Sequence, residues 1–148
     1  MAEAHVPLPH PGRVISYSYL WAREQVDGRE DGVKHRPCAI VLARTVVAGR
    51  ELITVVPVTH SPPANPVDVL EIPPAIKRLL GLDELASWIV LTEVNDFIWP
   101  GPDLAPIPGS GGQRFDYGVL PPGFFRVLRD RIGALIAERR VRQVPRTE

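Results

Sequence analysis

The sequence predicts a mainly β, α+β fold: a small, strongly bent antiparallel sheet or barrel with a short helix and a C-terminal helix. Several short runs of β-branched and aromatic residues, separated by turn-forming residues, favour such a fold. The 17 prolines keep helices few or short. A helical repeat of apolar residues appears near the C-terminus, and no alternation of strands and helices predicts a parallel sheet.

A chain of 148 residues with 45% hydrophobic residues suits one domain that buries its own core. We therefore expect a single domain over residues 1–148, with an extended lead-in at residues 1–12. No apolar run approaches the roughly 20 residues of a membrane helix, and the first residues lack the pattern of a signal peptide. The single cysteine, Cys38, excludes an internal disulfide framework. These features predict a cytoplasmic protein with no membrane partner and no cofactor.

The formal net charge is zero, but basic residues are concentrated at the C-terminal end. From Phe124 onward, seven arginines stand against three acidic residues, which leaves a net charge of +4. Such a segment can bind nucleic acid or an acidic partner. Alternatively, it is a solvated helix face with a frayed end. We expect residues 141–148 to form a mobile basic tail.

Three strands are predicted in the N-terminal half. The run from Arg13 to Trp21 is rich in β-branched and aromatic residues, and a charged loop from Glu24 to Lys34 follows it. The apolar run from Pro37 to Ala43 suits a strand buried on both faces, and the chain returns from Glu51 to Thr59 after a short turn, which predicts a hairpin. Pro57 has no N–H to donate, so it should lie at an edge, a bulge or a strand end.

Short strands and two helices are predicted in the C-terminal half. Strands are expected at Val69 to Ile72 and at Trp88 to Val94, with a further one at Leu104 to Ile107. Pro73 to Gly81 is typical of a short helix, with proline in its first turn and glycine after its end. The last helix should run from about Pro122 to about Arg140. Its apolar face is predicted by the spacing of Phe125, Leu128, Ile132, Leu135 and Ile136.

Polar residues with useful chemistry flank the predicted hairpin. His35 and Arg36 open its first strand, and Thr59 and His60 end its second. Because the start of one strand lies beside the end of the next, we expect these four residues to cluster at one sheet edge. An arginine, a hydroxyl and two imidazoles together can bind and turn over a phosphodiester. Alternatively, Arg36 pairs with an acid of the charged loop and the histidines are surface residues.

Other catalytic and metal-binding patterns do not occur in the sequence. It contains no His-Glu-x-x-His motif, no carboxylate cluster with metal spacing and no Gly-x-Ser-x-Gly elbow. The stretch Gly109-Ser110-Gly111-Gly112 lacks the Lys-Ser/Thr ending of a phosphate-binding loop and is interpreted as a surface linker. No metal site is expected.

Five short segments share the pattern of one protein family. Gly12-Arg13-Val14 precedes the first strand, Arg36-Pro37-Cys38 opens the buried run, and Val56-Pro57-Val58-Thr59-His60 closes the hairpin. The strand from Ser87 to Val94 and a turn at Gly118-Val119-Leu120 before the last helix complete the pattern. In these features the chain resembles the MazF/PemK toxins, the growth-inhibiting halves of bacterial type II toxin–antitoxin pairs. The resemblance covers nearly the whole chain.

The resemblance implies an SH3-like small barrel that forms a homodimer. It implies a metal-independent endoribonuclease toxin, which cleaves single-stranded RNA when a 2′-hydroxyl attacks the phosphodiester and leaves a cyclic phosphate. Arg36 and Thr59 would be the catalytic pair. A cognate antitoxin would neutralise the toxin, and operator DNA would be bound only together with that antitoxin.

Physical chemistry divides the roles among these residues. A guanidinium with a pKa above about 12 is a poor base, but its planar fork suits a pentacoordinate phosphate. Arg36 is therefore expected to stabilise the transition state, with Thr59 as a hydrogen-bonding positioner. An unperturbed imidazole titrates near pH 6.5, so His60 is the expected general base, with His35 beside it on the substrate. Alternatively, His60 is a solvated loop residue.

The chain departs from the family pattern at several positions. Arg13 stands where the family has Asp, and His60 stands where it has Ser. The strand after the second apolar run has Asp96 but lacks the Arg that PemK-like members place there. Asn95, Asp96 and Trp99 of this stretch are predicted to contact the substrate. Trp99 would stack on bases or, alternatively, pack in the core.

Two other functions fit the same features. A non-catalytic SH3-like module that binds a protein tail or nucleic acid is favoured by the neutral net charge, because proteins that bind nucleic acid tend to be basic. A regulator that holds duplex DNA with the Arg-rich end is the third possibility, although no recognition helix is evident.

Overall fold

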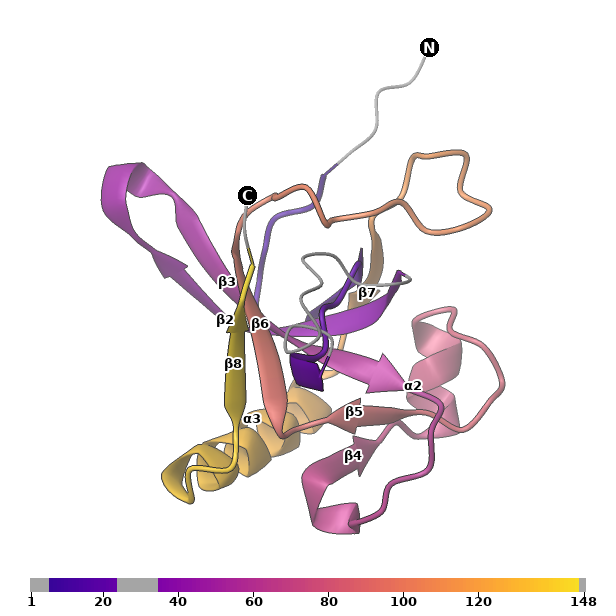
Figure 1. Cartoon of the computed structure of the whole chain (residues 1–148). Helices are drawn as coiled ribbons and strands as arrows, with labels where there is room; N and C mark the ends of the chain where they lie inside the picture. Colours follow the sequence, from indigo (N-terminus) through magenta and orange to yellow (C-terminus); the bar gives the residue numbers. More distant parts are fainter. Residues whose placement is uncertain (1–5, 24–34, 147–148) are drawn as a thin grey trace.

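The computed structural model describes residues 6–23 and 35–146, and within them it shows a mainly antiparallel sheet with two α-helices (Figure 1). The predicted mainly β, α+β class is confirmed. The charged loop from Glu24 to Lys34 and the first five residues of the lead-in lie outside the described residues.

The elements follow one another as short strands interrupted by two helices and two 3-10 turns. The strands are β1 (Arg13–Tyr17), β2 (Arg36–Thr45), β3 (Glu51–Thr59), β4 (Val69–Glu71), β5 (Trp88–Val90), β6 (Glu93–Ile98), β7 (Asp116–Val119) and β8 (Arg142–Pro145). The helices are α2 (Pro74–Leu79) and α3 (Pro122–Ala137), and the 3-10 turns are η1 (Val47–Gly49) and η2 (Pro66–Asp68).

The hairpin of β2 and β3 lies in the middle of the sheet, as predicted. The strand order is β4-β5-β3-β2-β1-β7, with β6 attached to β3 and β8 attached to β6. Among the described residues this path does not close on itself, so the sheet is open. Neighbouring residues of the hairpin enter different apolar clusters: Ala39 packs with the cluster that contains α3 residues, and Cys38 packs with a second cluster that contains Phe97. The stretch from Cys38 to Ile40 is therefore buried on both faces, as predicted. The prediction is wrong for the end of the run, because Leu42 is 44% exposed.

Pro57 lies where β3 changes its partner. The outer edge of β3 pairs with β6 through Leu52–Val55 and with β5 through Val58 and Thr59. Pro57 falls between these two stretches, which agrees with the prediction that it marks an interruption of the ladder.

The single strand predicted at Trp88 to Val94 is wrong, because the chain forms two strands there. Leu91 and Thr92 leave the ladder between β5 and β6. The Leu91 amide donates to the Asp68 carbonyl, and the Thr92 carbonyl accepts from the amide of Arg142, so both backbone groups are satisfied outside the sheet. The strand expected at Leu104 to Ile107 is reduced to one isolated bridge between Tyr17 and Leu104.

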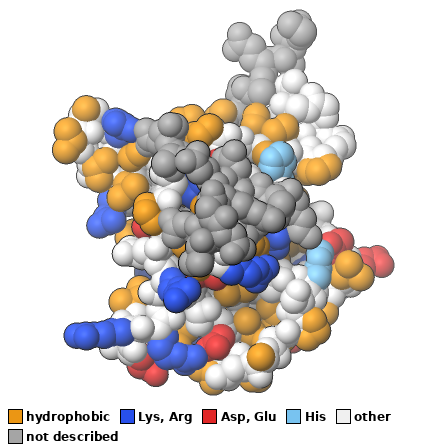
Figure 2. Space-filling model, viewed as in Figure 1, with side chains coloured by type: hydrophobic (Ala, Val, Ile, Leu, Met, Phe, Trp, Pro, Cys, Tyr) orange, Lys and Arg blue, Asp and Glu red, His pale blue; other side chains and the backbone are white. Residues whose placement is uncertain are grey.

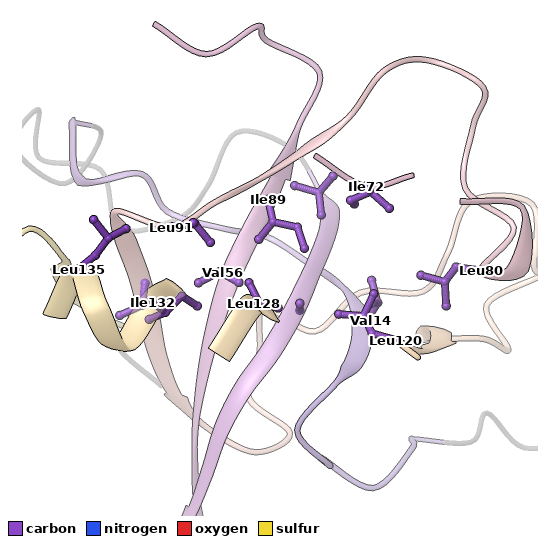
Figure 3. Close-up of a cluster of buried hydrophobic side chains, with 13 residues drawn as sticks. Val14, Val56, Ile72, Leu80, Ile89, Leu91, Leu120, Leu128, Ile132 and Leu135 are labelled. Carbon is purple, nitrogen blue, oxygen red and sulfur yellow. The ribbon is translucent and has the colours of Figure 1, made fainter. Parts of the chain in front are cut away.

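Helix α3 packs on the sheet through one apolar face (Figure 3). Leu128, Ile132 and Leu135 are buried in the same cluster as Val56, as the helical spacing predicts. Ile136 is 58% exposed and lies outside this face. The helix ends at Ala137 rather than near Arg140, because Arg139 adopts a left-handed backbone with φ of 58°.

The prediction of a mobile basic tail at residues 141–148 is wrong for most of its length. Arg142–Pro145 forms β8, which pairs in parallel with β6. Val144 is 1% exposed and packs with Leu20 and Ala22. The side chain of Arg146 is buried, where it pairs with Asp103 at 3.0 Å, donates to the Ser18 carbonyl at 2.6 Å, and lies over the ring of Tyr17. A new strand pairing and a buried ion pair hold this segment in place.

We expect Leu128→Ala to lower the free energy of unfolding by about 2–5 kcal/mol, because it opens a cavity at a fully buried position. Ile136→Ala, on the exposed side of the same helix, should change it by about 0.5 kcal/mol or less. Urea unfolding of the two variants and the parent measures this difference. Equal losses at both positions would contradict the packing of α3 described above.

We expect Arg146→Met to lower the free energy of unfolding by about 3–5 kcal/mol, because the Asp103 carboxylate would stay buried without its guanidinium. The matched control is Arg142→Met, at an exposed arginine of β8, with an expected change of about 0.5 kcal/mol or less. Thermal and urea unfolding report both. A mobile C-terminal end would make the two variants alike.

Candidate functional site

A small pocket lies where β2 begins and β3 ends. Its volume is about 130 Å³, and its lining includes His35, Arg36 and His60 together with Asp83 and Ser87 from the segment between α2 and β5. The antiparallel hairpin places these residues together, because its register pairs Cys38 with Pro57 and, two residues further, brings Arg36 opposite Thr59. The predicted meeting of the two strand ends is confirmed for His35, Arg36 and His60.

The guanidinium of Arg36 is held by the protein on two sides. Its Nη1 donates to the Val58 carbonyl at 3.3 Å, and its Cζ lies 5.0 Å from the centre of the Trp21 ring. The Cζ of Arg23 lies 5.0 Å from the same ring centre, so Trp21 contacts two cations. Such contacts orient a guanidinium.

Thr59 ends β3 with its side chain half-exposed. Its Oγ1 accepts a hydrogen bond from the Ser61 amide at 3.1 Å, which is the local geometry of a Ser/Thr turn. The hydroxyl therefore shapes the backbone that carries His60. A hydroxyl has a second lone pair and a proton, so this bond leaves it able to contact a ligand as well.

His60 contacts a carboxylate that the sequence did not single out. Its Nε2 lies 2.8 Å from Oδ2 of Asp83, and both side chains are about half-exposed. Oδ1 of the same carboxylate lies 2.7 Å from Nζ of Lys77. Figure 2 shows histidine and acidic side chains together on this face, over the region of α2.

The ammonium group of Lys77 is buried, and the residue is only 5% exposed. It donates to Asp83 and to Oγ of Ser87 at 2.6 Å, and it contacts the Leu85 carbonyl. Three oxygen acceptors for one buried ammonium satisfy all of its protons. Lys77 thus ties α2 to the chain segment that carries Asp83.

The pKa of the Asp83 carboxyl lies below its usual range. Partial burial acts to raise it, but the hydrogen bond from Lys77 and the charges of His60 and Lys77 outweigh that effect. Asp83 is therefore an anion at neutral pH. No sequence motif marks Asp83 or Lys77, and the only signal for Lys77 is that it is one of two lysines in an arginine-rich chain.

The other predicted substrate contacts lie away from this pocket. Asn95 is fully buried, and its side-chain amide exchanges two 2.8 Å hydrogen bonds with the backbone of Leu20. Asp96, the next residue of β6, accepts a hydrogen bond from the Thr54 hydroxyl at 2.6 Å. Trp99 packs against the second apolar cluster, with its ring centre 6.0 Å from that of Phe97. These three residues organise the sheet and its core, and none of them lines the pocket.

The structure also bears on cysteine and metal chemistry. Burial raises the pKa of the Cys38 thiol far above its usual range, so this cysteine is not a thiolate nucleophile. Within residues 6–23 and 35–146, no group of three or more His, Cys, Asp or Glu side chains is arranged to hold a metal ion.

No protein-family model and no curated protein matches the chain. In the part of the chain that the structure describes, no helix has the length and apolarity needed to cross a membrane.

The lowered pKa of Asp83 predicts an acid-sensitive contribution to stability. This contribution is present above the pKa of an unfolded Asp, about 4, and is lost as the pH falls through the lower folded value. We expect Asp83→Asn to lower the free energy of unfolding at neutral pH, and the gap to the parent to shrink in acid. Urea unfolding over a pH series measures this gap, with Glu84→Gln as the exposed neighbouring control. A gap that stays constant with pH would refute the ion pair.

Proposed function

We propose that the protein is a metal-independent endoribonuclease that cleaves single-stranded RNA in the cytoplasm. The observation that carries the proposal is the pocket shared by Arg36, His35 and His60, in which a cation suited to phosphate stands beside two imidazoles. The resemblance to MazF/PemK toxins includes Arg36 and supports the same activity, although His60 stands where that family has Ser.

The residues of the pocket supply the functions that this reaction needs. His60 accepts the proton of the 2′-hydroxyl, and the resulting oxygen attacks the adjacent phosphorus. Arg36 donates to the phosphate oxygens as negative charge builds on them. The bond to the 5′-oxygen breaks, and a 2′,3′-cyclic phosphate and a 5′-hydroxyl result. Thr59 holds the end of β3 on which His60 stands.

The proposal extends to the assembly and the partners of the protein. Its open sheet would be a divergent SH3-like barrel, two copies would form a homodimer, and a cognate antitoxin would block the RNA site. The exposed edges of a small open sheet favour pairing with a second copy, which covers apolar surface and unpaired strand edges.

A non-catalytic binding module is the second candidate. The observation that favours it is the size of the pocket, since about 130 Å³ is below the roughly 300–1,000 Å³ of most small-molecule sites. In that case the basic pocket would hold a phosphate of RNA, and no bond would break.

We expect Arg36→Ala and His60→Ala each to reduce RNA cleavage at least about a hundredfold, because each removes a group that acts on the reacting atoms. The melting temperature should change little for His60→Ala, since this side chain is half-exposed. Incubation with a random-sequence pool of single-stranded RNA, followed by mapping of the new ends, measures the cleavage.

Two variants outside the pocket serve as controls. Arg126→Ala, at an exposed arginine of α3, and His10→Ala, in the lead-in, should cleave like the parent. Cleavage products with 3′-phosphate or cyclic phosphate ends support the proposal. If, in a filter-binding assay, the parent binds RNA that Arg36→Ala does not bind, and neither protein produces new RNA ends, the protein is a non-catalytic binding module and not a nuclease.

A further inference from the structure

His60 does not stand alone in the pocket, and its neighbours bear on which ring nitrogen is reactive. We propose that Asp83, itself held by Lys77, is the positioning residue that fixes the orientation and tautomer of His60. This inference rests on the proposed RNA cleavage, to which it adds a base whose reactive atom is Nδ1.

The geometry selects one tautomer. Nε2 of His60 lies 2.8 Å from Oδ2 of Asp83, and a carboxylate at neutral pH only accepts hydrogen bonds. Nε2 must therefore carry the proton and donate it to Asp83. In a neutral imidazole the lone pair then lies on Nδ1, and the ring lines the pocket that Arg36 also lines. A contact of this kind is how a carboxylate orients a catalytic histidine in hydrolases.

Lys77 holds the Asp83 carboxylate in place. Its buried ammonium holds Oδ1 of Asp83 at 2.7 Å and Oγ of Ser87 at 2.6 Å. The Leu85 amide adds a hydrogen bond to the same Oδ1 at 3.1 Å. With Oδ1 occupied by two donors, Oδ2 is the oxygen that remains for His60. Both His60 and Asp83 are half-exposed, so without these bonds the carboxylate would have several rotamers available.

This arrangement provides an acceptor and a donor for each proton that the reaction moves. Nδ1 of His60 takes the proton of the 2′-hydroxyl, and the imidazole becomes an imidazolium whose charge faces the Asp83 carboxylate. The oxygen of the former hydroxyl bonds to phosphorus, and the electron pair of the breaking P–O bond goes to the 5′-oxygen. That oxygen takes a proton from His35 or from water. Asp83 stays ionised throughout, because its role is to hold the ring and to stabilise the imidazolium.

The charged and titratable groups around His60 come from three parts of the fold. The start of β2 contributes His35 and Arg36, α2 contributes Lys77, and the segment after α2 contributes Asp83. Among these described groups Asp83 is the anion. The imidazolium therefore has one counter-charge in direct contact, while Arg36 lines the same pocket, so Asp83 is the neighbour whose removal matters most.

Asp83→Asn tests this role, because it keeps the shape of the side chain but replaces an oxygen that accepts hydrogen bonds by an NH₂ group that donates them. The asparagine oxygen can still accept from Lys77, which turns the NH₂ group toward His60 and favours the opposite tautomer. We expect the turnover number on the RNA pool to fall at least about tenfold with little change in KM. The same substitution of a buried aspartate behind a catalytic histidine costs about 10⁴-fold. The matched control is Asp116→Asn, which removes an aspartate from its ion pair with Arg13 and should leave cleavage unchanged.

Nitrogen-15 NMR of the imidazoles reports the tautomer of His60 and does not require the protein to be active. The His60 signals, assigned by their loss in His60→Ala, should show a protonated Nε2 in the parent and in Asp116→Asn, and a protonated Nδ1 in Asp83→Asn. If Asp83→Asn does not fold, Asp83→Glu takes its place. The longer side chain keeps a charge for Lys77 but moves the carboxylate away from His60, so the same loss of turnover and an unfixed tautomer are expected.

The two measurements separate the inference from the function on which it rests. If the parent cleaves RNA and Asp83→Asn cleaves as well as Asp116→Asn, the positioning role is wrong and the nuclease stands. If the parent does not cleave, the nuclease is wrong, and the NMR result alone decides whether Asp83 fixes His60. A His60 tautomer that is the same in the parent and in Asp83→Asn overturns the inference in either case.

Discussion

The antiparallel pairing of β2 with β3 supports both the sheet and the pocket. β1 attaches to β2, and β5 and β6 attach to β3, so the remaining strands reach the hairpin through these neighbours. The pairing of the start of β2 with the end of β3 also brings Arg36 and His60 into one pocket. Backbone hydrogen bonds between two apolar strands thereby hold the Cα positions of these polar residues at a fixed separation, so only their side-chain rotamers remain to be ordered.

A second set of contacts holds the C-terminal end on the sheet. The guanidinium of Arg146 connects Asp103, the Ser18 carbonyl and the Asn95 side chain, so it links three separate stretches of chain. An ion pair buried this deeply needs further hydrogen bonds to compensate for the lost hydration. These hydrogen bonds explain why Asn95, which looks like a ligand-binding residue in the sequence, is a structural residue. They also explain why an arginine-rich end is ordered rather than solvated.

The site combines rigid and half-exposed parts. Arg36 is fixed by Trp21 and the Val58 carbonyl, whereas His60 and Asp83 lie partly in solvent. Lys77 connects these parts, because its buried ammonium needs several acceptors and thereby fixes the loop that carries Asp83. In the proposed reaction, a half-exposed imidazole held by a carboxylate would exchange protons with water after each turnover. The geometry of the pocket therefore depends on a short helix that lies outside the sheet.

Local patterns in the sequence determined the elements whose signal is periodic. The central hairpin, the interruption at Pro57 and the buried face of α3 through Leu128 and Ile132 follow from apolar spacing and from the missing N–H of proline. The meeting of Arg36 with His60 follows from the same hairpin. Tertiary structure alone decided the parts that rest on contacts between distant segments. β8 has no strand signal of its own and exists because β6 offers an unpaired edge, and Asp83 meets His60 only because Lys77 anchors its loop. A sequence shows which residues are apolar or charged, but a buried ion pair forms between groups whose distance is set by the whole fold.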